Sequence, residues 1–134
     1  MAASPDADGA RARAPRSACP VACTLDVIGD RWTLLIIRDL LAGKTRYGEF
    51  AASAEKIPTN ILADRLKRLE HERLIERVPY SQRPRRDGYR LTPEGRRLGP
   101  VVGALATWGE AHFPGTTRLR LGPERAAPVD PSQA

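Results

Sequence analysis

Residues 57–95 decide the fold, and they read IPTNILADRLKRLEHERLIERVPYSQRPRRDGYRLTPEG. Leucines at 62, 66 and 69 recur at helical spacing, which predicts a helix over 59–73 with one apolar face. Two short runs, 75–80 and 89–92, predict strands joined by a basic loop at 81–88, with Asp87-Gly88 as the turn signal. A helix followed by a basic hairpin suits a nucleic-acid duplex, because the helix fits a major groove and the arginines reach phosphates or a minor groove.

The segment before residue 57 is expected to be helical, with helices over 20–28, 31–42 and 46–53. Asp30 is a good N-cap for the second of these helices, and Gly43 is its stop. That second helix is apolar nearly all round, which places it at the centre of the core. The third, short helix is expected to bury Tyr47 and Phe50.

After the hairpin, Thr92-Pro93-Glu94 opens a last helix, which Pro100 should kink or split. The order of helices, two strands and a final helix is that of a winged helix-turn-helix, a mainly α fold with a small β-hairpin. Residues 18–113 are expected to form this one domain. The ends, 1–17 and 114–134, have little to bury and are expected to be disordered, the second of them mostly so.

The balance of charge favours an acidic partner. The formal net charge is +6, and residues 77–97 hold seven arginines against two acids. Of the 22 basic residues, 19 are arginine, a preference that a GC-rich genome explains better than function does. No segment resembles a signal peptide or a membrane span, so we expect a cytoplasmic, nucleoid-associated protein whose two cysteines are reduced at rest.

Several stretches together resemble the HxlR-type transcriptional regulators of bacteria, a winged-helix group close to the MarR regulators. These stretches are CPV at 19–21, LDVIGDRWTLLI at 25–36, YGEF at 47–50, LADRLKRL at 62–69 and YRLTPEG at 89–95. Pro58 and Asn60 depart from the family pattern, which points to an operator sequence of its own. The resemblance implies a DNA-binding regulator, a repressor more than an activator, that acts as a homodimer on a pseudo-palindromic operator.

In this interpretation the helix at 59–73 enters the major groove by its N-terminal half. The residues expected to contact DNA from it are Thr59, Asn60, Asp64, Arg65 and Lys67. Asn60 suits adenine and Lys67 suits a phosphate, whereas Arg65 lies beside the apolar stripe and serves either the DNA backbone or the structure. In the wing, Arg83, Arg85 and Arg86 are expected to meet phosphates or the minor groove.

The resemblance also places a dimer interface on the first and last helices. The expected interface or ligand-pocket residues are Val21, Leu25, Ile28, Val101, Leu105, Trp108 and His112. For Trp108 and His112, ordinary interface packing is favoured over a ligand pocket. Cys19 is either a small buried residue or a sensor thiol at a helix start, and the resemblance makes an oxidant, an electrophile or a small molecule the candidate effector.

Other classes of function are less well supported. The spacing of Cys19, Cys23, His71 and His112 matches no zinc pattern, so neither a metal nor a cofactor is expected. An enzyme is not expected, because a phosphate loop, a nucleophile elbow and paired carboxylates are all missing from the sequence. The remaining alternative is a winged-helix module for protein–protein contact without specific DNA binding.

Overall fold

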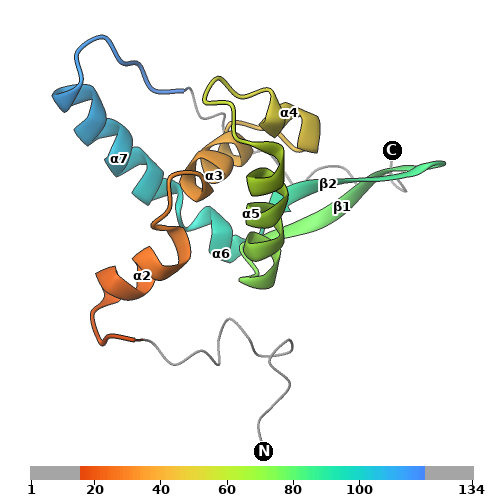
Figure 1. The fold of residues 1–134 in the computed structure, drawn as a ribbon, viewed down its shortest axis with the longest axis horizontal. Coiled ribbons are helices and arrows are strands. Elements are labelled where there is room, and N and C mark those ends of the chain that lie inside the picture. Colours follow the sequence, from red (N-terminus) through yellow and green to blue (C-terminus); the bar gives the residue numbers. More distant parts are fainter. Residues whose placement is uncertain (1–15, 120–134) are drawn as a thin grey trace, which may run out of the picture.

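The computed structural model describes residues 16–119, so most of the two expected disordered ends lies outside the described residues. In chain order the described elements are α2 (Pro20–Ile28), α3 (Thr33–Leu41), α4 (Tyr47–Ala51), α5 (Thr59–His71), β1 (Ile75–Gln82), β2 (Arg85–Leu91), α6 (Pro93–Arg96) and α7 (Gly99–His112). The strands form one antiparallel hairpin, which projects away from the helices (Figure 1). The predicted winged helix-turn-helix is confirmed.

The first two helices are separated by a short polar link. α2 has the predicted bounds, and Gly29 ends it by donating its backbone N–H to the Leu25 carbonyl oxygen at 2.8 Å. α3 begins two residues later than predicted. The Asp30 carboxylate nevertheless accepts the backbone N–H groups of Trp32 and Thr33 at 3.0 and 3.2 Å, which satisfies donors that a helix start leaves open. Gly43, with φ of 103°, follows the helix end as predicted.

The helix-turn-helix consists of α4, a turn over 52–58 and α5. α5 ends two residues before the predicted Arg73. Arg73 itself has φ of 60°, a left-handed conformation that a helix cannot continue, and Leu74 donates its N–H back to Leu69 at 2.9 Å. The chain therefore leaves α5 sharply and enters β1.

The core lies between α3 and the inner face of α5. Ile36 and Ile37 of α3 are fully buried, which confirms that this helix is central. The other members of the core come from α3, α4, α5, the turn before α5 and both strands: Leu40, Phe50, Ile57, Leu62, Leu66, Leu69, Ile75 and Leu91. Tyr47 was expected to be buried with Phe50 but is 38% exposed, because its hydroxyl reaches the surface to donate to the Thr59 carbonyl oxygen.

The hairpin is longer than predicted, and its turn lies elsewhere. The two strands pair until Gln82 meets Arg85, which leaves residues 83–84 at the turn. The prediction of a turn at Asp87-Gly88 was wrong, since both residues are paired within β2. A Cβ atom on residue 88 would lie only 2.9 Å from the Thr45 carbonyl oxygen, so glycine here permits a close approach of two backbones.

The last predicted helix is split, as Pro100 indicated. The Thr92 hydroxyl accepts the Gly95 N–H at 3.1 Å and caps α6, and Pro100 lies in the first turn of α7, where its missing N–H costs nothing. None of the helices in residues 16–119 combines the length and the apolar character that a membrane span requires.

Candidate nucleic-acid interface

The outer face of α5 carries the polar residues predicted to contact DNA. Its leucines hold the inner face in the core, and this leaves Thr59, Asn60, Asp64 and Lys67 exposed. The start of the helix is held in place by the Tyr47 hydroxyl, which bonds the Thr59 carbonyl oxygen at 3.1 Å. The arrangement offers an amide, a hydroxyl and an ammonium group on one rigid helix.

Arg65 is the predicted contact whose side chain is already engaged. Its Nε donates to Asp30 at 2.9 Å, it also pairs with Asp64, and its side chain is 20% exposed. The hydrogen bond with Asp30 raises the pKa of Arg65. Partial burial raises the pKa of Asp30, but hydrogen bonds from Thr33, Arg65 and Trp32 outweigh it and lower that pKa to about 2. Arg65 thus ties α5 to the link between α2 and α3.

The three predicted wing arginines are all exposed near the tip of the hairpin, but they are not equivalent. Arg85 pairs with Asp87 at 3.2 Å. For Arg83 and Arg86 the structure shows no ion pair with any residue of 16–119. Nearer the base, Arg77 pairs with Glu70 and Arg90 pairs with Glu76, so the uncompensated charge is concentrated at the tip. We call Thr59, Asn60, Asp64 and Lys67, together with Arg83, Arg85 and Arg86, the α5–hairpin surface.

The structure adds a link between α5 and the hairpin that the sequence did not predict. The Thr45 carbonyl oxygen accepts the Tyr89 N–H at 2.7 Å, beside the close approach at Gly88. Two residues later, Tyr47 bonds the start of α5. The segment 45–47 therefore holds α5 and the hairpin, the two elements predicted to contact DNA, at a fixed position relative to each other. A glycine within a strand can signal that another backbone segment approaches closely. From the sequence alone, Gly88 indicated a turn instead.

A buried carboxylate supports the turn before α5, and sequence reasoning missed it as well. Asp39 of α3 is fully buried and accepts hydrogen bonds from Arg38 at 2.9 and 3.1 Å and from the Ser53 hydroxyl, while Lys44 lies 3.6 Å away. Arg38 also pairs with Glu55 at 2.8 Å, and this bond raises the pKa of Arg38. The available signal was an aspartate within a largely apolar helix, since a buried charge persists only when it is paired.

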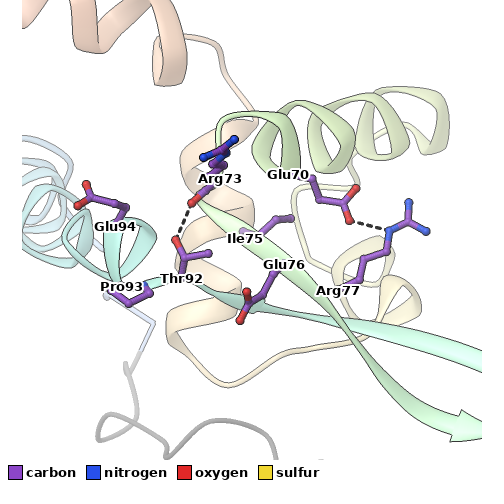
Figure 2. A pocket seen from close by; sticks show the side chains of 8 residues that line it. All are labelled: Glu70, Arg73, Ile75, Glu76, Arg77, Thr92, Pro93 and Glu94. Carbon is purple, nitrogen blue, oxygen red and sulfur yellow. Dashed lines mark hydrogen bonds and ion pairs between the residues drawn. The ribbon is translucent and has the colours of Figure 1, made fainter. Parts of the chain in front are cut away.

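A hollow of about 560 Å³ lies at the base of the hairpin, beside the end of α5 and α6 (Figure 2). It is lined by Glu70, Arg73, Ile75, Glu76, Arg77, Thr92, Pro93 and Glu94. Figure 2 shows that Arg77 turns toward Glu70, at 2.6 Å, and that the Thr92 hydroxyl donates to the Arg73 carbonyl oxygen at 2.7 Å. These contacts join α5 to β1 and to the end of the hairpin. The packing of these elements against one another therefore accounts for the hollow.

Two helices on the opposite side of the molecule expose large apolar side chains. In Figure 1, α2 and α7 lie on the side away from the hairpin. Their exposed apolar residues, which we call the α2–α7 surface, are Val21, Leu25, Val101, Leu105 and Trp108, between 37% and 66% exposed. Ile28 does not belong to it, because it is 5% exposed and packs within the protomer. His112 stacks on Trp108 with 4.6 Å between ring centroids.

Both cysteines are free thiols at the start of α2. Cys19 is exposed immediately before the helix, so the alternative in which it is a buried residue does not hold in this chain. Cys23 is half-buried, and its thiol donates to the Ser17 carbonyl oxygen at 3.1 Å. The nearby Arg16 is paired with Asp26 at 2.7 Å. An exposed thiol next to an exposed apolar helix face is accessible to a reagent or to a second chain.

Comparison with known proteins gives a consistent result. The model of the HxlR-like helix-turn-helix family matches residues 27–117. An uncharacterized HTH-type transcriptional regulator of Mycobacterium tuberculosis, Rv3095, is 42% identical over 90 residues, which are 67% of this chain and 56% of that protein. The chain thus spans little more than half the length of this relative.

Solved structures of similar proteins lead to the same family. PA1607, named as a candidate transcription factor, is 42% identical with a TM-score of 0.70, over 85% of this chain and 81% of that one. The oxidized form of the redox regulator HypR is 35% identical with a TM-score of 0.65, over 75% of this chain and all of that one. The chain therefore belongs to the HxlR-like helix-turn-helix family.

Proposed function

We propose that this protein is a sequence-specific DNA-binding transcriptional regulator, a repressor that acts as a homodimer on a pseudo-palindromic operator. The observation that carries the proposal is the α5–hairpin surface. It joins a rigid helix with exposed Thr59, Asn60 and Lys67 to a hairpin whose tip carries the uncompensated charges of Arg83 and Arg86. A helix of this kind reads base edges in a major groove, and guanidinium groups bind phosphates or a narrow minor groove.

Within this surface the residues divide by the chemistry they offer. The Asn60 amide both donates and accepts, so it matches the N6 and N7 atoms of adenine. Lys67 offers a point charge that suits a phosphate, which positions the protein without reading sequence. Arg65 acts through α5, because its bond to Asp30 orients the helix.

The homodimer is supported by the α2–α7 surface. No residue of α7 is buried in the single chain, and Trp108 is 61% exposed. A second copy covering α2 and α7 would remove this apolar area from water, which is favourable by about 25 cal/mol per Å². Two copies related by a two-fold axis present two α5 helices to two half-sites, which is why the operator should be pseudo-palindromic.

Control by an oxidant or electrophile at Cys19 is the favoured effector mechanism. Its support is the exposed thiol beside the α2–α7 surface and the likeness to HypR, a protein named as a redox regulator with known oxidized and reduced forms. A change at Cys19 would alter the packing of α2 against the partner copy and with it the spacing of the two α5 helices. A small molecule beside Trp108 and His112 is the second candidate.

The function is tested by selecting bound fragments from DNA upstream of the protein's own gene and from random duplexes, then measuring affinity by fluorescence anisotropy. A regulator should bind its selected site about 10³-fold or more tightly than unrelated DNA. Asn60→Ala should reduce that ratio, whereas Lys67→Ala should weaken binding to both duplexes equally. Equal affinity for every duplex would instead favour the protein–protein module.

A further inference from the structure

One arginine between α5 and the hairpin has no role in the function described so far. Arg46 precedes α4, and its guanidinium lies over the ring of Tyr80 in β1, with 4.1 Å between the guanidinium carbon and the ring centroid. Both side chains are exposed. Within residues 16–119 the structure shows no ion pair for Arg46, whereas arginines at 38, 65, 77, 85 and 90 are paired with acids.

The backbone on both sides of Arg46 is anchored to the two predicted DNA contacts. Thr45 accepts the Tyr89 N–H of the hairpin at 2.7 Å, and Tyr47 donates to Thr59 at the start of α5 at 3.1 Å. The Glu49 carboxylate accepts the N–H groups of Thr45 and Arg46 at 3.1 and 3.0 Å. Arg46 is therefore fixed between the recognition helix and the wing, in its backbone as well as in its side chain.

The geometry of a duplex indicates which part of the DNA a residue at the position of Arg46 would face. A strand of phosphates separates the major groove from the next minor groove. A protein that places α5 in the first groove and the hairpin tip at the second must cross that strand, and a residue fixed between the two elements faces it. Stacking occupies one face of the guanidinium and leaves the N–H groups at its edge free to donate to phosphate oxygens.

We propose that Arg46, held in place by the ring of Tyr80, binds the DNA phosphate strand between the recognition helix and the wing. The inference rests on the proposed DNA-binding function and adds a contact site to it. Tyr80 is a positioning residue: it orders a long side chain before binding, so that less conformational entropy is lost on the DNA. The contact is to phosphate, and it therefore adds affinity without adding sequence preference.

The test measures binding of the full chain to a duplex from its own upstream DNA and to an unrelated duplex, at several salt concentrations. Arg46→Ala should weaken binding to both duplexes by the same factor, roughly tenfold, and should lower the logarithmic salt slope by about 0.9 for each bound protomer. Arg46→Lys should restore most of the slope, because it keeps the charge. Arg97→Ala removes an exposed arginine of another region and should bind like wild type.

The role of Tyr80 is tested in the same assay. Tyr80→Phe keeps the aromatic ring and should bind like wild type, whereas Tyr80→Leu should weaken binding in the presence of Arg46 and have no further effect on Arg46→Ala. An unchanged salt slope in Arg46→Ala, or a loss confined to the upstream duplex, overturns the Arg46 site while the proposed function stands. If wild type binds both duplexes equally, the proposed function fails. The difference in salt slope between wild type and Arg46→Ala still decides whether Arg46 touches phosphate.

Discussion

On the side of α5 and the hairpin, most exposed side chains are polar or charged, whereas α2 and α7 expose Leu25, Leu105 and Trp108 on the other side. The first side is also closely connected: α5 is tied to its neighbours through Arg65 and Asp30, and the hairpin through Tyr89 and Thr45. On the other side, α7 buries none of its residues. Two sides so different suit two different partners.

The difference shows how one small domain separates two tasks. The α5–hairpin surface has fixed geometry and excess positive charge, which are what a regular, anionic ligand such as duplex DNA requires. The α2–α7 surface has neither, but it has apolar area, which drives association of protein chains. In this account the first surface decides where the protein binds, and the second, with Cys19 beside it, decides when.

The largest expected effect compares two leucines that differ in their surroundings. Leu66 of α5 is 2% exposed, whereas Leu105 of α7 is 53% exposed. Leu66→Ala leaves a cavity in the core and should lower the free energy of unfolding by about 2–5 kcal/mol at any protein concentration. Chemical denaturation followed by circular dichroism measures this loss.

Leu105→Ala is the matched control, since it removes the same atoms from the other surface. Its effect on the unfolding free energy should be small at low protein concentration and should grow with concentration, because the lost contact belongs to the proposed dimer. A loss as large as that of Leu66→Ala in the dilute protein would show that Leu105 packs within one chain and would remove the contrast between the two sides.

The second effect separates the three wing arginines. Arg83 and Arg86 show no acidic partner within residues 16–119, whereas Arg85 pairs with Asp87. The double variant Arg83→Ala with Arg86→Ala should lower the logarithmic salt slope of DNA binding by about 1.8 per bound protomer, from two lost phosphate contacts. Arg85→Ala should lower it less. Equal effects of all three single substitutions would mean that the pair with Asp87 opens on DNA.

The smallest effect concerns the charge that ties α5 to the rest of the chain. The pKa of Asp30 is about 2 in the folded chain, below its usual 3.8. A lowered pKa stabilises the fold above the unfolded value, so this contribution is complete above about pH 4 and is lost as the pH falls through 2. Because the carboxylate is partly exposed, solvent screening reduces the contribution to about 1 kcal/mol.

Asp30→Asn isolates this charge, because the amide oxygen can still accept the N–H groups at the start of α3. The variant should be less stable than wild type by about 1 kcal/mol at pH 7, and the difference should vanish as the pH falls below about 2. Denaturation curves of both proteins across this range provide the measurement. A difference that does not change with pH would mean that packing, and not charge, distinguishes the two side chains.

The sequence predicted those features that depend on local chemistry. Helical spacing of apolar residues gave α2, the spacing of Leu62, Leu66 and Leu69 gave the buried face of α5, and Pro100 marked the split before α7. Each of these signals acts within a few residues, so no knowledge of the rest of the chain was needed.

Features that depend on contact between distant segments could not be predicted. Asp87-Gly88 has the composition of a turn, but the approach of Thr45 places Gly88 inside a strand. Helical periodicity assigned Ile28 to the face of Val21 and Leu25, and only the packing of α2 shows that Ile28 is buried. The role of Asp30 as a partner of Arg65, and that of Arg46 as a partner of Tyr80, likewise join residues about 35 positions apart.

The most direct test of the account is a hydroxyl-radical footprint of the full chain on its selected DNA site. A dimer that uses its α5–hairpin surface on DNA and its α2–α7 surface on a second copy should protect two half-sites on one face of the duplex. Their centres should lie about 10 base pairs apart, or a multiple of that spacing. A single protected segment, or protection spread evenly along the duplex, would contradict the division of the molecule into a DNA-reading side and a pairing side.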